Sequence, residues 1–213
     1  MRSIIKTDFL VIGSGIAGLS FAIESSKYGK VSIITKKKLM ESNTNLAQGG
    51  IAVVLGEDDS FGSHINDTLK NGCGLCNRVA VETLVKNGPH AINWLMDLGV
   101  DFEKEHDKLD LSIESGHSKR RIVYKGDYTG REIEETLVEF VRQKNGIDIY
   151  ENCLALDLIT RDKRSYGVEI LDIKEDNIVL FLSKATILAT GGIGQLYSQT
   201  SPSTAKNPFK NSF

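Results

Sequence analysis

Four side chains that could bind a carboxylate and move a proton lie within one short polar segment of the sequence. An arginine guanidinium pairs with a carboxylate through two parallel hydrogen bonds. An imidazole close to a carboxylic acid can act as a general acid or base. Most charged runs, however, are solvated surface loops. The local pattern therefore leaves a substrate site and a plain loop equally open for Glu114, His117, Arg120 and Arg121.

A glycine loop near the N-terminus is the second candidate for chemistry. Gly13, Gly15 and Gly18 follow the apolar run 9–12 at G-x-G-x-x-G spacing, and a helix is expected over 16–28. The first glycine permits a tight turn, the second lets the backbone approach a pyrophosphate, and the third lets the helix pack close to the strand. The pattern predicts a dinucleotide site, with a structural glycine turn as the alternative.

The strand expected after this helix, 31–35, closes a β-α-β unit and ends beside Lys36. An NAD-binding fold carries an acid about twenty residues after the glycines, where it binds the ribose hydroxyls. No acid stands there. A lysine at this place argues against plain NAD, although it is also typical of a solvated turn.

The segment 41–52 is rich in small and amide-bearing residues and predicts a second loop that faces the ligand. Gly49 and Gly50 would let the backbone approach a flat ring or a phosphate. Hydrogen-bond donors and acceptors come from Asn43, Thr44, Asn45 and Gln48. A surface loop of the ordinary kind remains the alternative, because the same residues dominate turns.

The elements that must position these residues predict an α/β fold. Apolar patterns place helices over 60–69, from 79 to the break at Gly88–Pro89, through 92–98, and from Thr129 to Asn145. Thr129 and Glu132 suggest a capping box, and 103–110 is expected to be a loop. Strands are expected over 147–151, 155–160, 165–172, 178–182 and 185–189.

The last of these strands ends at Thr190, Gly191 and Gly192, and open α/β sheets bind ligands at the carboxyl ends of their strands. The strands before it form a β meander. We therefore predict a Rossmann-like domain over 1–200, with a parallel sheet and an inserted β meander, and an irregular tail over 201–213.

Composition excludes several other classes of protein. The chain has 213 residues and a net charge of −2 with both signs interspersed, which argues against a nucleic-acid surface. No apolar run could span a membrane, and no secretory signal precedes the first strand, so a cytoplasmic protein is expected. Cys73 and Cys76 form a C-x-x-C with no second ligand pair. We expect no metal site there, and two buried thiols instead.

Taken together, the motifs resemble the L-aspartate oxidase family, which belongs to the succinate dehydrogenase and fumarate reductase flavoprotein superfamily. The resemblance runs from about Thr7 to Ser201, and its first and last blocks are common to many flavoproteins. The central two point to the oxidases. The blocks are 12–20, 44–52, 116–122 with 129–132, and 189–197.

This resemblance implies FAD as the cofactor. Asn43 stands where the covalent succinate dehydrogenase branch has a histidine bonded to the flavin, so FAD is expected to be held non-covalently. The motifs and the resemblance together assign to FAD the residues Gly13, Ser14, Gly15, Ile16, Ala17, Gly18, Lys36, Asn43, Thr44, Asn45, Leu46, Ala47, Gln48, Gly49, Gly50, Leu154, Ala155, Thr190, Gly191 and Gly192.

For catalysis, Glu114 matches the family's acid that orients the substrate amino group, and His117 and Arg121 complete the candidate set. Ile113 and Ser115 depart from the arginine and glycine usual in the family. The implied reaction oxidises L-aspartate to iminoaspartate for quinolinate and NAD synthesis, with oxygen or fumarate as acceptor and quinolinate synthase as a partner. The alternatives are a fumarate reductase-like flavoprotein, and a non-catalytic FAD-binding fragment or half of a split flavoprotein.

Members of this family continue well past this point into a capping domain that brings further catalytic groups. We therefore expect the isolated chain to have little or no oxidase activity. An open sheet edge is also expected to make it poorly soluble alone.

Overall fold

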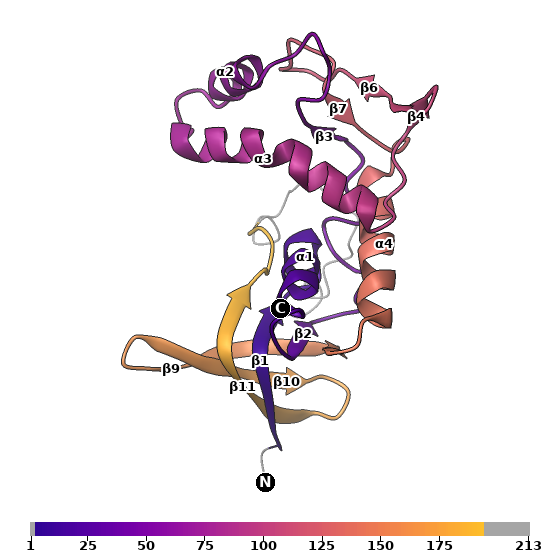
Figure 1. Cartoon of the computed structure of the whole chain (residues 1–213). Helices are drawn as coiled ribbons and strands as arrows, with labels where there is room; N and C mark the ends of the chain where they lie inside the picture. Colours follow the sequence, from indigo (N-terminus) through magenta and orange to yellow (C-terminus); the bar gives the residue numbers. More distant parts are fainter. Residues whose placement is uncertain (1–2, 194–213) are drawn as a thin grey trace, which may run out of the picture. The chain divides into compact units, whose positions relative to one another are not determined.

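A computed structural model describes residues 3–193, and the chain divides into two compact units (Figure 1). The sheet unit consists of 1–46 and 137–213, and the inserted unit of 47–136. The tail expected over 201–213 and the last residues of the fourth motif block lie outside the described residues.

A six-stranded sheet forms the sheet unit, in the order β8-β2-β1-β11-β10-β9. The first four strands run parallel, and β10 and β9 add to them antiparallel. Helix α1 (Ile16–Ser25) connects β1 to β2 and packs on both. The predicted α/β fold with a parallel sheet and a β meander is confirmed. The strands are β1 (Ser3–Ile12), β2 (Val31–Thr35), β8 (Ile147–Glu151), β9 (Cys153–Arg161), β10 (Arg164–Asp172) and β11 (Asn177–Leu188).

The apolar runs that predict these strands form their core. Every residue of β2 is buried, as expected for a parallel strand covered on both faces. The alternating residues of β10 and β11, such as Val168, Ile170 and Phe181, pack on Leu10 and Ile34. The meander thus shares one core with the parallel strands.

Strand β11 corrects a prediction, because the two strands expected at 178–182 and 185–189 are one continuous strand. Its ladder with β1 carries Ser183 opposite Thr7 and Ala185 opposite Phe9. The polar interruption does not end the strand, because the backbone ladder with β1 continues to Leu188. Lys184 Nζ also lies 2.6 Å from Asp8 on β1, at an exposed position.

In the inserted unit, α2 (Phe61–Asn71) packs on α3 (Arg78–Asp97) through Ile65, Val81 and Val85. The break expected at Gly88–Pro89 is wrong, because α3 continues through Pro89. Val85, Ile92 and Leu95 are buried on both sides of the proline, so packing outweighs its helix-breaking effect. Asn77 caps this helix as predicted, accepting from the amide of Ala80 at 3.1 Å.

Short strands complete the inserted unit. The expected loop 103–110 contains a two-stranded hairpin. The predicted capping box of α4 (Thr129–Gln143) is wrong: Thr129 Oγ1 accepts from the amide of Lys125, and Glu132 Oε1 from that of Asp101. The strands are β3 (Ile51–Ala52), β4 (Lys104–Glu105), β5 (Lys108–Leu109), β6 (Leu111–Ser112) and β7 (Ile122–Val123).

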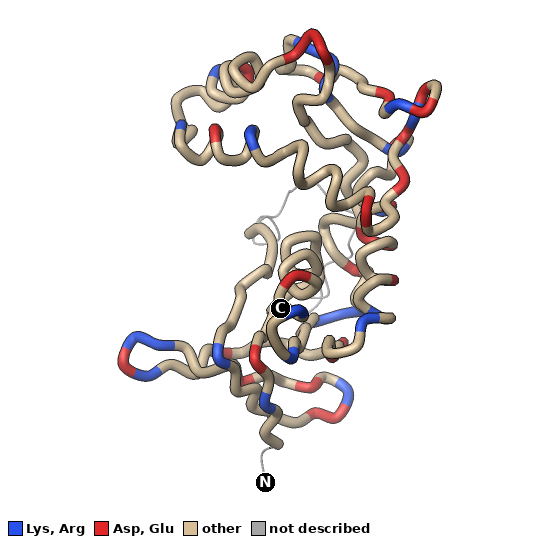
Figure 2. The backbone as a smooth tube through the Cα atoms, in the orientation of Figure 1, with Lys and Arg blue, Asp and Glu red and all other residues tan. Residues whose placement is uncertain are grey.

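Charges of both signs are interspersed along the described chain (Figure 2). Within residues 3–193, no helix is long and apolar enough to cross a membrane. The same residues contain no group of three or more histidine, cysteine, aspartate or glutamate side chains that could hold a metal.

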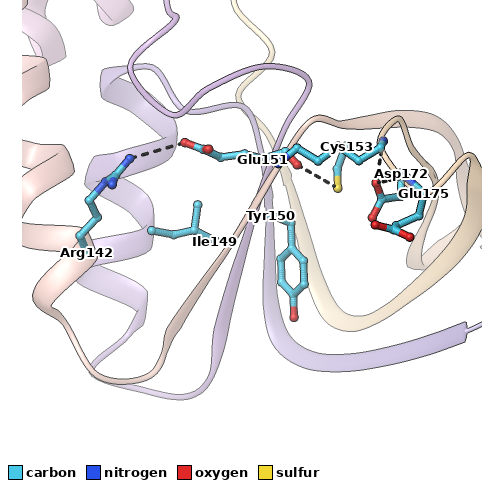
Figure 3. A pocket seen from close by; sticks show the side chains of 8 residues that line it. Arg142, Ile149, Tyr150, Glu151, Cys153, Asp172 and Glu175 are labelled. Atoms are coloured by element: carbon cyan, nitrogen blue, oxygen red, sulfur yellow. Dashed lines mark hydrogen bonds and ion pairs between the residues drawn. The ribbon is translucent and has the colours of Figure 1, made fainter.

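The cysteines differ in exposure. Cys73 is exposed and Cys76 half-buried, so the prediction of two buried thiols is wrong, whereas Cys153 on β9 is buried. Figure 3 shows Cys153 beside Glu151, whose carboxylate pairs with Arg142 at 3.5 Å. Burial raises the pKa of the Cys153 thiol to about 11, and the charge of Asp172 adds to this rise.

We predict that Cys153 resists alkylation in the native chain. A rise of the pKa from 9.0 to about 11 lowers the thiolate fraction at neutral pH roughly a hundredfold. Iodoacetamide labelling followed by peptide mass mapping should show Cys73 modified long before Cys153. In denaturant the two should react at similar rates, and equal rates in the native chain would contradict the assignment.

Candidate functional site

The turn between β1 and α1 lies across the carboxyl ends of three parallel strands. The amide of Gly13 donates to Ile34 at the end of β2 at 2.9 Å, and the amide of Ala189 donates to Ile12 at 2.8 Å. Gly13 has φ +113°, and a Cβ there would lie 2.2 Å from the carbonyl oxygen of Ala189. Only glycine fits, as its place in the predicted turn requires.

The other two glycines serve different ends. A Cβ at Gly18 would lie 2.1 Å from the carbonyl oxygen of Gly13, so this residue lets α1 approach the turn closely. A Cβ at Gly15 would meet only Thr44 Oγ1, at 3.3 Å, and the side chain of Ser42 beyond it. Gly15 is therefore the glycine whose missing side chain leaves space rather than relieving a backbone contact.

The N-terminus of α1 suits an anion. Its N-cap, Gly15, offers no side-chain cap, and the first turn contains no acidic residue. The amide dipoles there favour a negatively charged group such as a phosphate.

The loop after β2 reaches this turn, as predicted. Thr44 Oγ1 accepts from the amide of Ile16 at 3.0 Å. Asn43 Nδ2 lies 3.9 Å from the position of a Cβ at Gly191, beyond the end of β11. The structure thus brings the glycine loop, the start of the 43–50 loop and the Thr190–Gly192 corner to one edge of the sheet.

Several assigned residues have structural roles in the sheet unit. Ser14 is buried and its hydroxyl lies 3.2 Å from that of Thr35, so its backbone faces the turn. Asn45 closes its own loop by donating to Met40, and its buried Oδ1 has no hydrogen-bond partner among the described residues. Ala155 packs against the core at the start of β9.

The remaining FAD candidates of the sheet unit include Ala17, Leu46 and Lys36, which are exposed, and Leu154, which is half-buried at the start of β9. The second half of the 43–50 loop belongs to the inserted unit. Ala47 accepts from the amide of Gly130 at 3.0 Å, while Gln48 and Gly49 are exposed.

Glu114 is exposed, and its Oε1 accepts from the amide of Gly50 at 3.3 Å, so the acid lies against the 47–50 loop of its own unit. His117 is half-buried, and its ring packs edge-on to His64 on α2 with the ring centroids 5.7 Å apart. The structure therefore keeps Glu114 accessible and gives His117 a histidine neighbour that sequence reasoning missed.

Arg121, the third candidate for catalysis, is buried among side chains of the inserted unit. Its guanidinium is fully buried, and so is the Asp59 side chain that it binds through two hydrogen bonds of 2.8 Å. It also donates to Asp67 at 2.8 Å and to Ser63 at 2.9 Å. A direct catalytic role for Arg121 stays a prediction, and its burial favours a positioning role instead.

The three partners of Arg121, together with Asn71, which donates to Gly116, carry a signal that the sequence contains but that our sequence reasoning did not use. Asp59, Ser63, Asp67 and Asn71 recur every four residues. Residues at this spacing share one face of a helix.

His64 is 6% exposed and lies among these charges. Burial lowers the pKa of its imidazole, and the positive charge of Arg121 and the neighbouring His117 lower it further, against the opposing charges of Asp59 and Asp67. The neutral ring is therefore the favoured form in the folded protein.

A comparison with protein families identifies the fold's cofactor. The sequence model of the FAD binding domain family matches residues 8–212. The chain belongs to this family. FAD is accordingly its cofactor, and the anion-favouring helix terminus, the space at Gly15 and the amide-rich loop beside it fit a dinucleotide.

The most similar proteins include L-aspartate oxidases. The chain is 44% identical over 206 residues to the chloroplastic enzyme of Oryza sativa and 41% identical over 206 residues to that of Yersinia pestis. These matches cover 94% and 91% of this chain but only 31% and 39% of the relatives. The chain thus spans about a third of their length.

Solved structures that superpose on this chain include succinate dehydrogenase and fumarate reductase flavoproteins. A mutated E. coli quinol fumarate reductase superposes with a TM-score of 0.89 at 28% identity, covering 92% of this chain and 34% of the other. Mycobacterium smegmatis Sdh1 superposes with a TM-score of 0.85 at 30% identity, covering 92% and 35%.

We predict that Gly15→Ala weakens FAD binding without unfolding the chain. The backbone at Gly15 has φ −74°, which alanine adopts readily, so the added methyl group fills ligand space instead of straining the turn. The affinity for FAD, measured by quenching of flavin fluorescence, should fall about tenfold or more.

Gly62→Ala in α2 is the matched control, because a Cβ there meets nothing closer than Ser60 Oγ at 3.9 Å. Both variants should keep the native circular dichroism. If Gly15→Ala binds FAD as tightly as this control, the glycine does not line the cofactor site.

We also predict that His64 makes the protein less stable on mild acidification. Because its folded pKa lies below the ordinary value of 6.5, the unfolded state takes up the proton first. The loss of stability that His64 causes is absent above about pH 7 and grows as the pH falls through 6.5 toward the folded pKa.

Denaturant unfolding at several pH values should therefore give a smaller loss of stability for His64→Gln than for the wild type. His90→Gln, at an exposed position on α3, should follow the wild type. An unchanged pH dependence in His64→Gln would exclude this histidine as the source.

Proposed function

We propose that this chain is the FAD-binding part of an L-aspartate oxidase, which oxidises L-aspartate to iminoaspartate. One observation carries the proposal: L-aspartate oxidases of plants and bacteria match more than nine-tenths of the chain at 41–44% identity. FAD, when bound, would accept the hydride from the substrate carbon. The proposed FAD ligands are the residues assigned from the sequence, with the glycine turn at their centre.

Glu114 is proposed to orient the substrate's amino group. One oxygen of its exposed carboxylate accepts a hydrogen bond from the amide of Gly50, which holds the group in place. The other oxygen is left to pair with an ammonium group. His117 lies three residues away, and its Nδ1 has no hydrogen-bond partner among residues 3–193. That nitrogen is also buried, so the proposed role of His117 toward a substrate carboxylate or a proton falls to the rest of its half-buried ring.

Asn43 supports non-covalent binding of FAD. An amide cannot form the bond to flavin that a histidine at this place makes in the succinate dehydrogenase branch. The side chain faces the Thr190–Gly192 corner and can offer a hydrogen bond there instead.

Fumarate reduction is the second candidate, favoured by the high TM-score to the E. coli quinol fumarate reductase. Sequence identity favours the oxidase, at 44% against 28%. A cytoplasmic location, an acceptor such as oxygen or fumarate, and an association with quinolinate synthase belong to the same proposal. The four plant relatives carry the word chloroplastic in their names.

Anaerobic mixing of the FAD-loaded chain tests the reaction. L-aspartate should bleach the visible absorbance of the flavin, even if steady-state turnover is low, and acid precipitation should release all flavin into the supernatant. Glu114→Gln should slow the bleaching, because it removes the charge that pairs with the amino group.

Reduced flavin that fumarate reoxidises, with no response to L-aspartate, would favour the second candidate. Flavin retained in the acid pellet would contradict the role given to Asn43. If neither L-aspartate nor fumarate changes the flavin absorbance or binds to the protein, both proposed functions are contradicted.

A further inference from the structure

A single face of α2 carries a row of polar side chains directed at another segment of the inserted unit. Ser63, Asp67 and Asn71 lie four residues apart on the helix, and Asp59 continues the spacing just before it. Four residues are close to one helical turn, so these side chains form one line.

The row contacts the segment 116–121 in reverse order. Asn71 Nδ2, at the end of α2, donates to the carbonyl of Gly116 at 2.7 Å. Asp59, before the start of the helix, binds the guanidinium of Arg121. The helix and the segment therefore run antiparallel, and Ser63 and Asp67 in the middle of the row contact both Ser118 and Arg121.

Asp67 lies in the middle and makes the largest share of the contacts. Its Oδ2 accepts the amide and the hydroxyl of Ser118, each at 2.8 Å, and Nη1 of Arg121 at 2.8 Å. Burial alone would raise the pKa of this carboxyl, but the hydrogen bonds from Ser118 and Arg121 outweigh it and lower the pKa. The carboxylate is therefore ionised at neutral pH, with its Oδ2 bound by Ser118 and Arg121.

Ser118 directly follows His117, whose own amide donates to the carbonyl of Glu114 at 3.2 Å. Gly116, which lies between Glu114 and His117, has φ +89°, so the segment turns tightly there. The backbone that carries both candidate substrate groups is thus fixed at Gly116 and at Ser118, and both anchors are side chains of α2.

We propose that Asp67 is the positioning residue of the substrate segment: through Ser118 and Arg121 it holds the backbone of 114–118 so that Glu114 and His117 face the substrate. The inference rests on the proposed function for the role of those two residues. Its structural half, that Asp67 sets the conformation of the segment, stands without it.

The test uses the whole 213-residue chain loaded with FAD. The chain has only four histidines, so their ring signals can be resolved by NMR; they are His64, His90, His106 and His117. In Asp67→Ala the signals of His117 and His64 should shift, those of the other two should not, and hydrogen exchange at the Ser118 amide should quicken about tenfold or more, because a hydrogen-bonded amide becomes free.

Binding is measured with L-aspartate and with succinate, followed through the His117 signal. We expect the affinity for both to fall about tenfold in Asp67→Ala. Asp67→Asn retains hydrogen-bond acceptance without the charge and should lie between the wild type and Asp67→Ala in both exchange and affinity.

Asp58→Ala is the matched control, because Asp58 is exposed and pairs only with Lys119 among the described residues, at 3.1 Å. It should leave the histidine signals and the affinities unchanged. If Asp67→Ala does not fold, Asp67→Asn takes its place, because it keeps the size of the side chain and removes only the charge that Ser118 and Arg121 bind.

The outcomes separate the two proposals. Unchanged His117 signals and Ser118 exchange in a folded Asp67→Ala, or in Asp67→Asn where that variant takes its place, would overturn the positioning role. Shifted signals and faster exchange, with no binding of either dicarboxylate even to the wild type, would overturn the proposed substrate but uphold the role of Asp67 in the segment.

Discussion

The sheet unit depends on the close approach of three backbones at the end of β1. The turn at Gly13 lies against the carbonyl of Ala189 as β11 ends, and the first turn of α1 lies against Gly13 through Gly18. No side chain fits at either glycine. This approach directs the N-terminus of α1 to the carboxyl edge of the sheet, where the Asn43–Thr44 loop and the Thr190–Gly192 corner also end. The helix dipole and the free space at Gly15 make that edge suitable for a phosphate.

The inserted unit depends on a different constraint, the burial of one guanidinium. Arg121 shares no surface with solvent and is bound by two carboxylates, and removing one partner of such a pair typically costs about 3–5 kcal/mol. Arg121 joins α2 to strand β7, and one of its two carboxylates, Asp67, also binds Ser118 in the segment that carries the candidate substrate groups. Stability of this unit and the geometry of its site thus share the same atoms, Asp67 most of all.

The two candidate sites meet in the sequence at the 43–50 loop. Its first half contacts the glycine turn of the sheet unit, and its second half contacts Glu114 in the inserted unit. Each half of the loop thus makes these contacts within its own unit. Small residues suit this position, because each contact is made by backbone amides or by a side chain no larger than that of asparagine or threonine.

The sequence by itself determined the α/β class, the glycine turn, the capping of α3 by Asn77 and the FAD family, because each depends on residues that are neighbours along the chain. Tertiary structure decided the rest. It carried β11 past Lys184 by pairing it with β1 along both halves, and kept α3 helical through Pro89 by burying its apolar face on both sides. It also separated Arg120, which is exposed, from Arg121, which is buried. Adjacent arginines look alike in a sequence, and only carboxylates more than fifty residues away determine which of them enters the core.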